Sequence, residues 1–141
     1  SSLPAVGYQN QKMFGSGITW LMSTLQDMNN GLDEQTLGSF KVPTDAGFMS
    51  GDSIVLEIWG SDGTLQGAYS FMDEANMVGW GLSIPGWYPL DLVQGWTATD
   101  DDCANNTVMI PSGKMVVITS GEADTTLTIP DPMKVTPPAA K

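Results

Sequence analysis

Histidine is absent from this chain of 141 residues, and cysteine occurs once, at Cys103. The lack of histidine excludes Ser-His-Asp and Cys-His catalysis and removes the usual zinc ligands. A single cysteine allows no disulfide bond within the chain. The neighbouring carboxylates Asp100, Asp101 and Asp102 disfavour the thiolate that a reactive cysteine needs, so we interpret Cys103 as a small buried side chain.

Arginine is also absent, and five lysines face sixteen aspartates and glutamates, which gives a net charge of −11. Phosphate backbones and anionic lipids are repelled by such a chain, so binding to nucleic acid is not expected. We interpret the acidity as a means of keeping a surface soluble at high local density.

Long apolar runs are lacking too. The longest candidate, Ile18 to Leu25, is interrupted by the polar residues Thr19, Ser23 and Thr24, so no membrane span is expected. The sequence begins at Ser1 without an initiator methionine, which fits removal of a leader peptide. We therefore expect a secreted protein, extracellular or at the cell surface.

The composition favours β structure. Glycine occurs 16 times and proline 9 times, and Thr, Val and Ile recur where a helix would have Ala, Glu or Lys. We predict an all-β protein, an antiparallel β-sandwich or jelly roll with extended N- and C-terminal arms. Single turns of helix are expected within Met22–Gly31 and Phe71–Val78. Strands are predicted at Val6–Asn10, Ile18–Leu25, Ser53–Trp59, Thr64–Phe71, Thr107–Ile110, Lys114–Ser120 and Thr125–Ile129.

Two hairpins are predicted among these strands. Ser53–Trp59 and Thr64–Phe71 flank Asp62-Gly63, a pair that supplies the positive φ of a tight turn, and Ser53–Trp59 alternates with period two. A second hairpin is expected around Ile110-Pro111-Ser112-Gly113. The last three strands are then expected to form an antiparallel meander.

Tryptophan is concentrated between residues 80 and 96, where Trp80, Trp87 and Trp96 each follow a glycine. Three such rings form a platform suited to stacking on sugar rings, with Asp91, Gln94 and Asp100 as hydroxyl acceptors. The other interpretation is that the rings fill the core or a subunit interface, as tryptophan usually does. We favour the second interpretation and keep a carbohydrate-binding module as the alternative function.

The acidic residues offer weak evidence for other chemistry. Asp100, Asp102 and Asn105 carry oxygen ligands of the kind that Ca²⁺ takes, but their spacing is not that of an EF-hand, so a solvated acidic turn is favoured. No cofactor is expected. Paired carboxylates such as Asp73 and Glu74 are too common in an acidic chain to indicate a glycosidase, and we expect a protein that is not an enzyme.

The two ends are proline-bearing and extended. We divide the chain into an N-terminal extended arm or first strand at 1–10, a β-sandwich domain at 11–129 and a Pro-rich C-terminal tail at 130–141. Proline fixes φ and biases the preceding residue toward extended backbone, so each end is suited to joining the sheet edge of a neighbouring subunit. The alternative for the tail is that it folds back on its own domain. Val6, Tyr8 and Val135 are the predicted assembly residues. Head-to-tail repetition of such a contact builds a filament.

Three segments together resemble a known type of protein: Val6-Gly7-Tyr8-Gln9-Asn10, the Gly-Trp pairs and Ile110–Ile118. With its V-G-Y-x-N opening, the chain resembles an uncharacterised secreted β module of planctomycete and verrucomicrobial bacteria. The resemblance implies an exported β-sandwich and assigns no catalytic or binding residue. The resulting hypothesis is a non-enzymatic, homopolymeric structural subunit of a pilus-like extracellular filament, with copies of itself as partners.

Overall fold

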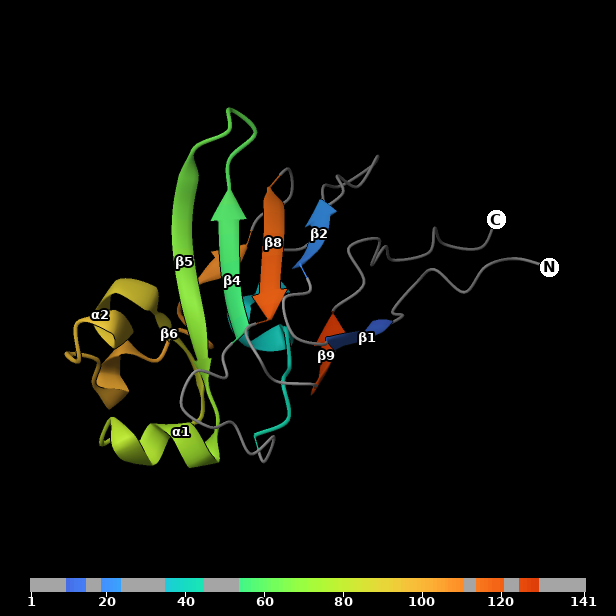
Figure 1. Ribbon diagram of the computed structural model, residues 1–141. Coiled ribbons are helices and arrows are strands. Elements are labelled where there is room, and N and C mark those ends of the chain that lie inside the picture. Colours follow the sequence, from blue (N-terminus) through green and yellow to red (C-terminus); the bar gives the residue numbers. More distant parts are fainter. Residues whose placement is uncertain are drawn as a thin grey trace, which may run out of the picture.

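The computed structural model describes residues 10–14, 19–23, 35–44, 54–110, 114–120 and 125–129 (Figure 1). The protein is mainly β, with antiparallel strands and few helices, which confirms the predicted class at this level. The largest sheet has five strands in the order β2-β8-β4-β5-β6. Its strands are β2 (Thr19–Ser23), β8 (Met115–Ser120), β4 (Ile54–Trp59), β5 (Leu65–Met72) and β6 (Gly86–Pro89).

Two short strand pairs and four short helices complete the described part of the chain. One pair joins β1 (Asn10–Phe14) to β9 (Thr125–Ile129), and the other joins β3 (Gln35–Thr36) to β7 (Met109–Ile110). The helices are η1 (Leu37–Ser39), α1 (Glu74–Gly79), α2 (Leu90–Gln94) and η2 (Asp100–Asp102). Figure 1 shows α1 and α2 beside β5 and β6, at the opposite edge of the sheet from β2 and the β1–β9 pair.

The predicted hairpin is confirmed as β4 and β5. Gly63 has φ +82°, and the Gly60 N–H donates to the Thr64 carbonyl at 2.8 Å to close the turn. The Asp62 carboxylate accepts hydrogen bonds from the backbone N–H and the hydroxyl of Thr64. Along β4 every second residue is buried, beginning with Ile54, as the period-two pattern predicted.

The predicted meander is wrong. Its three strands belong to three different sheets: β7 pairs with β3, β8 lies between β2 and β4, and β9 pairs with β1. The second predicted hairpin, from Thr107–Met109 to Lys114–Ile118, is therefore also wrong. Adjacent strand-forming segments suggest a hairpin only when no distant strand competes, and here a six-residue register joins β8 to β4.

The main core lies against one face of the five-stranded sheet. It combines Ile54, Leu56 and Ile58 of β4 with side chains from every other sheet, including Ile110 of β7 and Leu127 of β9. Among its members, Trp87 and Leu127 are fully buried. Residues far apart in sequence therefore share one interior.

A smaller core lies on the other face of β5 and β6. Phe71 and Trp87 belong to the main core, whereas Met72 and Tyr88, their neighbours along the two strands, pack with Leu82 and Val93. Successive residues of a strand point to opposite faces, so this end of the sheet is covered on both sides. We call residues 73–85 and 90–104, which include α1, α2 and η2, the helical lobe.

Hydrogen bonds at helix ends organise the helical lobe. The buried Asp73 caps α1, accepting from the Asn76 N–H at 2.8 Å. Thr99 and Asp102 form a reciprocal capping box around η2. The single helical turn predicted within Phe71–Val78 is confirmed by α1, which starts one residue after its cap.

Candidate functional site

Trp87 lies in the main core and not on a surface. Its side chain is 0% exposed, its Nε1–H donates to the Phe40 carbonyl at 2.8 Å, and its ring meets Phe71 edge to face at 5.2 Å. This geometry agrees with the favoured interpretation that the tryptophans fill the interior. A fully buried ring takes no part in a sugar-binding platform, so Trp87 is removed from the alternative site.

Trp80 and Trp96 lie together, with ring centroids 4.1 Å apart and planes inclined by 7°. We call these two residues the tryptophan pair. Trp80 is the residue that ends α1, and its Nε1–H donates to the Val93 carbonyl at 3.1 Å. Trp96 follows the Gly95 that ends α2, and its backbone N–H bonds to the same carbonyl at 3.1 Å. The ends of two helices thus bring the rings into contact.

The outer ring of the pair is exposed. Trp96 is 67% exposed, the largest exposed aromatic side chain among the described residues. Its φ is +57°, a region that costs a non-glycine residue about 1 kcal/mol or more. Such conformations persist where surrounding contacts stabilise them. Here the backbone N–H of Trp96 donates to the Val93 carbonyl, and its ring stacks on that of Trp80.

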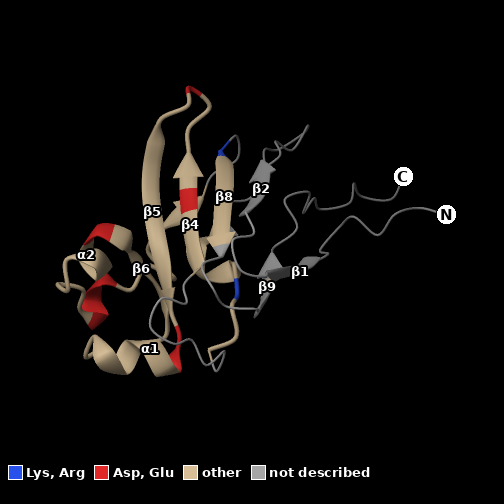
Figure 2. Ribbon diagram, in the orientation of Figure 1, with Lys and Arg blue, Asp and Glu red and all other residues tan. Residues whose placement is uncertain are grey.

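The surroundings of the tryptophan pair are acidic. The helical lobe contains six carboxylates, from Asp73, Glu74, Asp91 and Asp100 to Asp102, and neither lysine nor arginine. Figure 2 shows these acidic positions at α1, at α2 and in the segment after α2, with no basic position among them. The lobe therefore repels anions and attracts cations.

The three oxygen-bearing side chains proposed for calcium serve three separate structural contacts. Asp100 accepts from the Ser83 N–H at 2.7 Å, and Asp102 accepts from Thr99 in the capping box. Asn105 accepts from the Trp87 N–H at 2.9 Å and donates to the Pro85 carbonyl at 3.3 Å. Within the described ranges, no group of three or more metal-binding side chains is placed to hold an ion.

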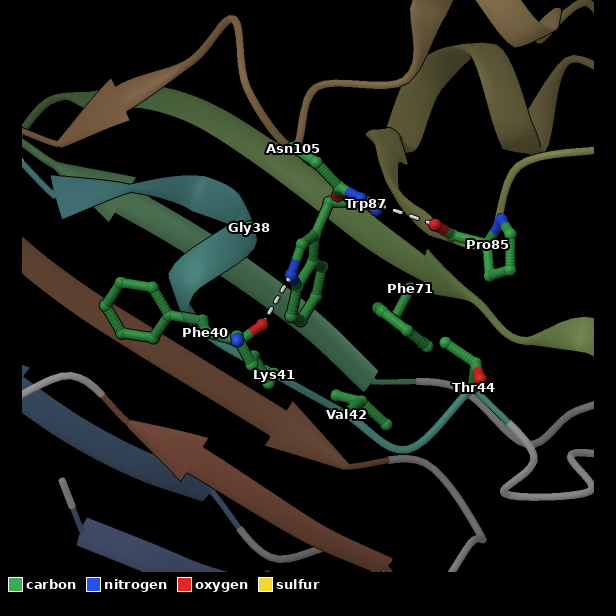
Figure 3. Close-up of a pocket in the computed structure, with 9 residues that line it drawn as sticks. All are labelled: Gly38, Phe40, Lys41, Val42, Thr44, Phe71, Pro85, Trp87 and Asn105. Atoms are coloured by element: carbon green, nitrogen blue, oxygen red, sulfur yellow. Dashed lines mark hydrogen bonds between the residues drawn. The ribbon is translucent and has the colours of Figure 1, made fainter.

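A recess of about 160 Å³ lies beside Trp87 (Figure 3). Most of its apolar walls are themselves almost fully buried, and Lys41 is its single titratable side chain. Asn105 links the segments that line the recess, because its backbone carbonyl also accepts from the Gly38 N–H at 2.8 Å. The lining residues are Gly38, Phe40, Lys41, Val42, Thr44, Phe71, Pro85, Trp87 and Asn105. With one ammonium and no carboxylate in its lining, the recess offers no acid and base pair.

Cys103 is half-buried beside the smaller core and is not fully enclosed as the sequence suggested. Nearby, burial raises the pKa of the Tyr88 phenol, and the neighbouring Cys103 and Asp100 raise it further. The Tyr88 hydroxyl donates to the Ile84 carbonyl at 2.6 Å. Burial, followed by the charge of Asp91, also raises the pKa of Tyr69.

The predicted assembly residues Val6, Tyr8 and Val135 lie outside the described residues. The nearest described strands are β1 and β9, the first and last of the fold, and they pair antiparallel from Asn10 opposite Ile129 to Phe14 opposite Thr125. Among the described elements, β9 is the one that β1 contacts extensively. None of the described helices is long and apolar enough to cross a membrane.

Sequence reasoning missed the contact between Trp80 and Trp96, and it grouped Trp87 with them. The available signal was the position of the glycines: Gly79 and Gly95 stand at the ends of helices, whereas Gly86 opens a strand. Comparisons with models of protein families, with curated proteins and with solved structures returned no match, so the site is interpreted from its own geometry.

Proposed function

We propose that this protein is a secreted, non-enzymatic structural subunit that forms a pilus-like filament by exchanging a terminal strand between neighbouring copies. The observation that carries the proposal is the pairing of β1 with β9, the first and last described strands. In the exchanged form, β1 of one subunit pairs with β9 of the next. The same contacts are made in both forms, which is the usual condition for exchange of an element between identical chains.

The two strands differ in how they are attached to the domain. Leu127 of β9 is fully buried in the main core, so β9 is anchored on its own subunit. β1 contacts mainly β9, through five residue pairs. A two-stranded pair of this length is marginal in water, so little is lost when β1 leaves one β9 for another. The structure thus supports β1 as the donor and β9 as the acceptor.

We also propose the finer architecture, a β-sandwich or jelly roll. Ile110 of β7 and Leu127 of β9 share the main core with the inward face of the five-stranded sheet. Two layers of strands around one core are the defining feature of a sandwich. In this architecture the β1–β9 and β3–β7 pairs belong to the second layer, opposite the large sheet.

The sequence supports the remaining parts of the proposal. Val6 and Tyr8 directly precede β1, and Val135 follows β9, so a longer exchanged segment in either direction contains them. A net charge of −11 keeps a repetitive surface soluble, and the resemblance to secreted β modules favours an extracellular location.

The proposal is tested by electron microscopy and light scattering on the intact chain and on truncated chains. We expect the intact chain to form filaments, and a chain lacking residues 1–14 to form none. A synthetic peptide of residues 1–14 added in excess should shorten filaments of the intact chain by occupying β9. A chain lacking residues 130–141 shows whether the C-terminal tail contributes. Monomers of the intact chain at every concentration would contradict the proposal.

A second candidate is a carbohydrate-binding module, which the exposed face of Trp96 favours. The indole ring supplies an apolar stacking surface, and Asp91 and Gln94 of the adjacent α2 supply hydroxyl acceptors. Affinity electrophoresis in gels containing soluble polysaccharides tests this candidate. Retardation that is lost in Trp96→Ala and retained in Trp59→Phe would support it, and unretarded migration in every gel would remove it.

A further inference from the structure

The tryptophan pair is a fixed aromatic surface. Trp80 is held by its hydrogen bond to Val93, and Trp96 is stacked on Trp80 in nearly parallel planes. The inner face of the Trp96 ring is therefore occupied, while most of the residue is open to solvent. A ring that is already in place loses little conformational freedom when a ligand stacks on it.

The charge around the pair selects the ligand. An indole face attracts cations through its quadrupole, and tryptophan does so more strongly than tyrosine or phenylalanine. The helical lobe has six carboxylates and no lysine or arginine. Its negative potential therefore also favours cations. Asp91 belongs to α2, the helix after which Trp96 follows, and its backbone carbonyl accepts from the N–H of Gly95, the residue before Trp96.

We propose that the tryptophan pair binds an ammonium group, carried either on a small alkylammonium compound or on an amino sugar. The cation lies over the open face of Trp96, and the acidic lobe raises its local concentration. The inference is independent of filament formation, and where the carrier is a sugar it rests on the carbohydrate-binding candidate and narrows it. Uronic acids and sulfated glycans are excluded by the same charges.

An NMR titration of the intact chain measures the preference directly. The probes are choline and 3,3-dimethyl-1-butanol, which differ by replacement of the charged nitrogen with carbon. The indole N–H signal of Trp96 reports binding, and that of the buried Trp87 serves as an internal control. We expect choline to bind about three- to fivefold more tightly than the neutral alcohol, in line with an exposed cation–π contact. The preference should shrink as salt is added, because the charges of the lobe are screened.

Variants separate the ring from the charge. In Trp96→Leu, followed through the indole N–H signal of the neighbouring Trp80, the preference for choline should be abolished. An unchanged Trp87 signal shows that the fold is intact. Asp91→Asn should weaken choline binding, whereas Asp62→Asn removes the same charge at the distant β4–β5 turn and should have no effect. Equal binding of choline and the alcohol, or equal loss in both aspartate variants, would overturn the proposal.

The source of the ammonium is identified with oligosaccharides. Glucosamine trimer, N-acetylglucosamine trimer and glucose trimer present similar rings with and without a positive charge. Tighter binding of glucosamine trimer than of choline assigns the site to amino sugars, and the reverse assigns it to alkylammonium compounds. Equal binding of all three trimers would overturn the ammonium proposal while supporting the carbohydrate candidate, and failure of every probe to bind would overturn both.

Discussion

The five-stranded sheet and the helical lobe use the same residue pair, Gly-Trp, for opposite purposes. In the sheet, Gly86 begins β6 and Trp87 is directed into the main core, where its indole N–H donates to the carbonyl of Phe40, 47 positions away. In the lobe, Gly95 ends α2 and Trp96 emerges into solvent. Trp87 is thus buried where its glycine begins a strand that runs along the core, and Trp96 is exposed where its glycine ends a helix.

The two regions also differ in how they are stabilised. The sheet relies on apolar burial by strands from the whole length of the chain. The helical lobe has a small apolar cluster and depends on caps and turns, such as those at Asp73 and Asp102. Mutations should therefore be costly in the sheet and mild in the helical lobe.

The largest expected effect comes from comparing Trp87→Ala with Trp96→Ala. Loss of Trp87 leaves a large cavity and an unpaired Phe40 carbonyl, and we expect a cost of about 3–5 kcal/mol. Loss of the exposed Trp96 should cost less than about 1 kcal/mol. Urea denaturation followed by circular dichroism measures both, and Trp87→Phe replaces the alanine variant if that chain does not fold. Equal losses of stability in the two variants would contradict this difference between the sheet and the helical lobe.

Glycines in the two regions should respond differently to alanine. At Gly86, φ is +155° and an added Cβ would overlap the side-chain amide of Asn105, so we expect a loss of about 2–3 kcal/mol. Gly79, the last residue of α1, has open space around it, and Gly79→Ala should be neutral or stabilise by about 0.5 kcal/mol. A Gly86→Ala chain as stable as the native one would show that Asn105 does not restrict this position.

Within the helical lobe, the caps should matter more than the charges. Asp73→Ala removes the buried cap of α1 and should lower the free energy of unfolding by about 1–2 kcal/mol. Asp101→Ala removes an equal charge from an exposed position of η2 and should change the stability by less than about 0.5 kcal/mol. Thermal denaturation of the two variants at one salt concentration compares them. Equal losses would assign the effect to net charge.

The smallest effect is a pH dependence. Burial raises the pKa of Tyr88 in the folded protein above the value of about 10 in the unfolded chain. The unfolded chain then loses its proton first, so the stability contributed by Tyr88 is complete below pH 10 and declines above it. Tyr88→Phe should lose stability less steeply between pH 10 and 11.5, with Tyr69 accounting for the remainder. An unchanged slope would contradict this assignment.

Local signals in the sequence predicted local structure well. Alternation in β4 and the Asp62-Gly63 turn depend on residues close in sequence, and both are as expected. The short elements β6 and α2 were missed, because Pro85 and Pro89 and a length of four or five residues give no periodic pattern to detect. The partners of β8 were also missed, because β2 and β4, the strands on either side of it, are distant from it in the sequence.

The contact between Trp80 and Trp96 was missed for a related reason. Trp80 and Trp96 approach each other because α1 and α2 both pack on β5, and this packing depends on the smaller core. Spacing along the sequence grouped three tryptophans. In the structure Trp87 lies in the main core on one face of the sheet, and Trp80 and Trp96 lie together on the side of the smaller core.

Cross-linking tests the proposed exchange of β1 most directly. Gln11 of β1 is opposite Thr128 of β9, so cysteines at these two positions lie within reach of a disulfide whenever the strands pair. With Cys103→Ser as background, one chain carries Gln11→Cys and another Thr128→Cys. Strand exchange predicts a disulfide-linked dimer when the two chains are mixed and oxidised, and a ladder of linked chains from the double variant. A double variant that closes only within single chains, with no dimer from the mixture, would contradict the account.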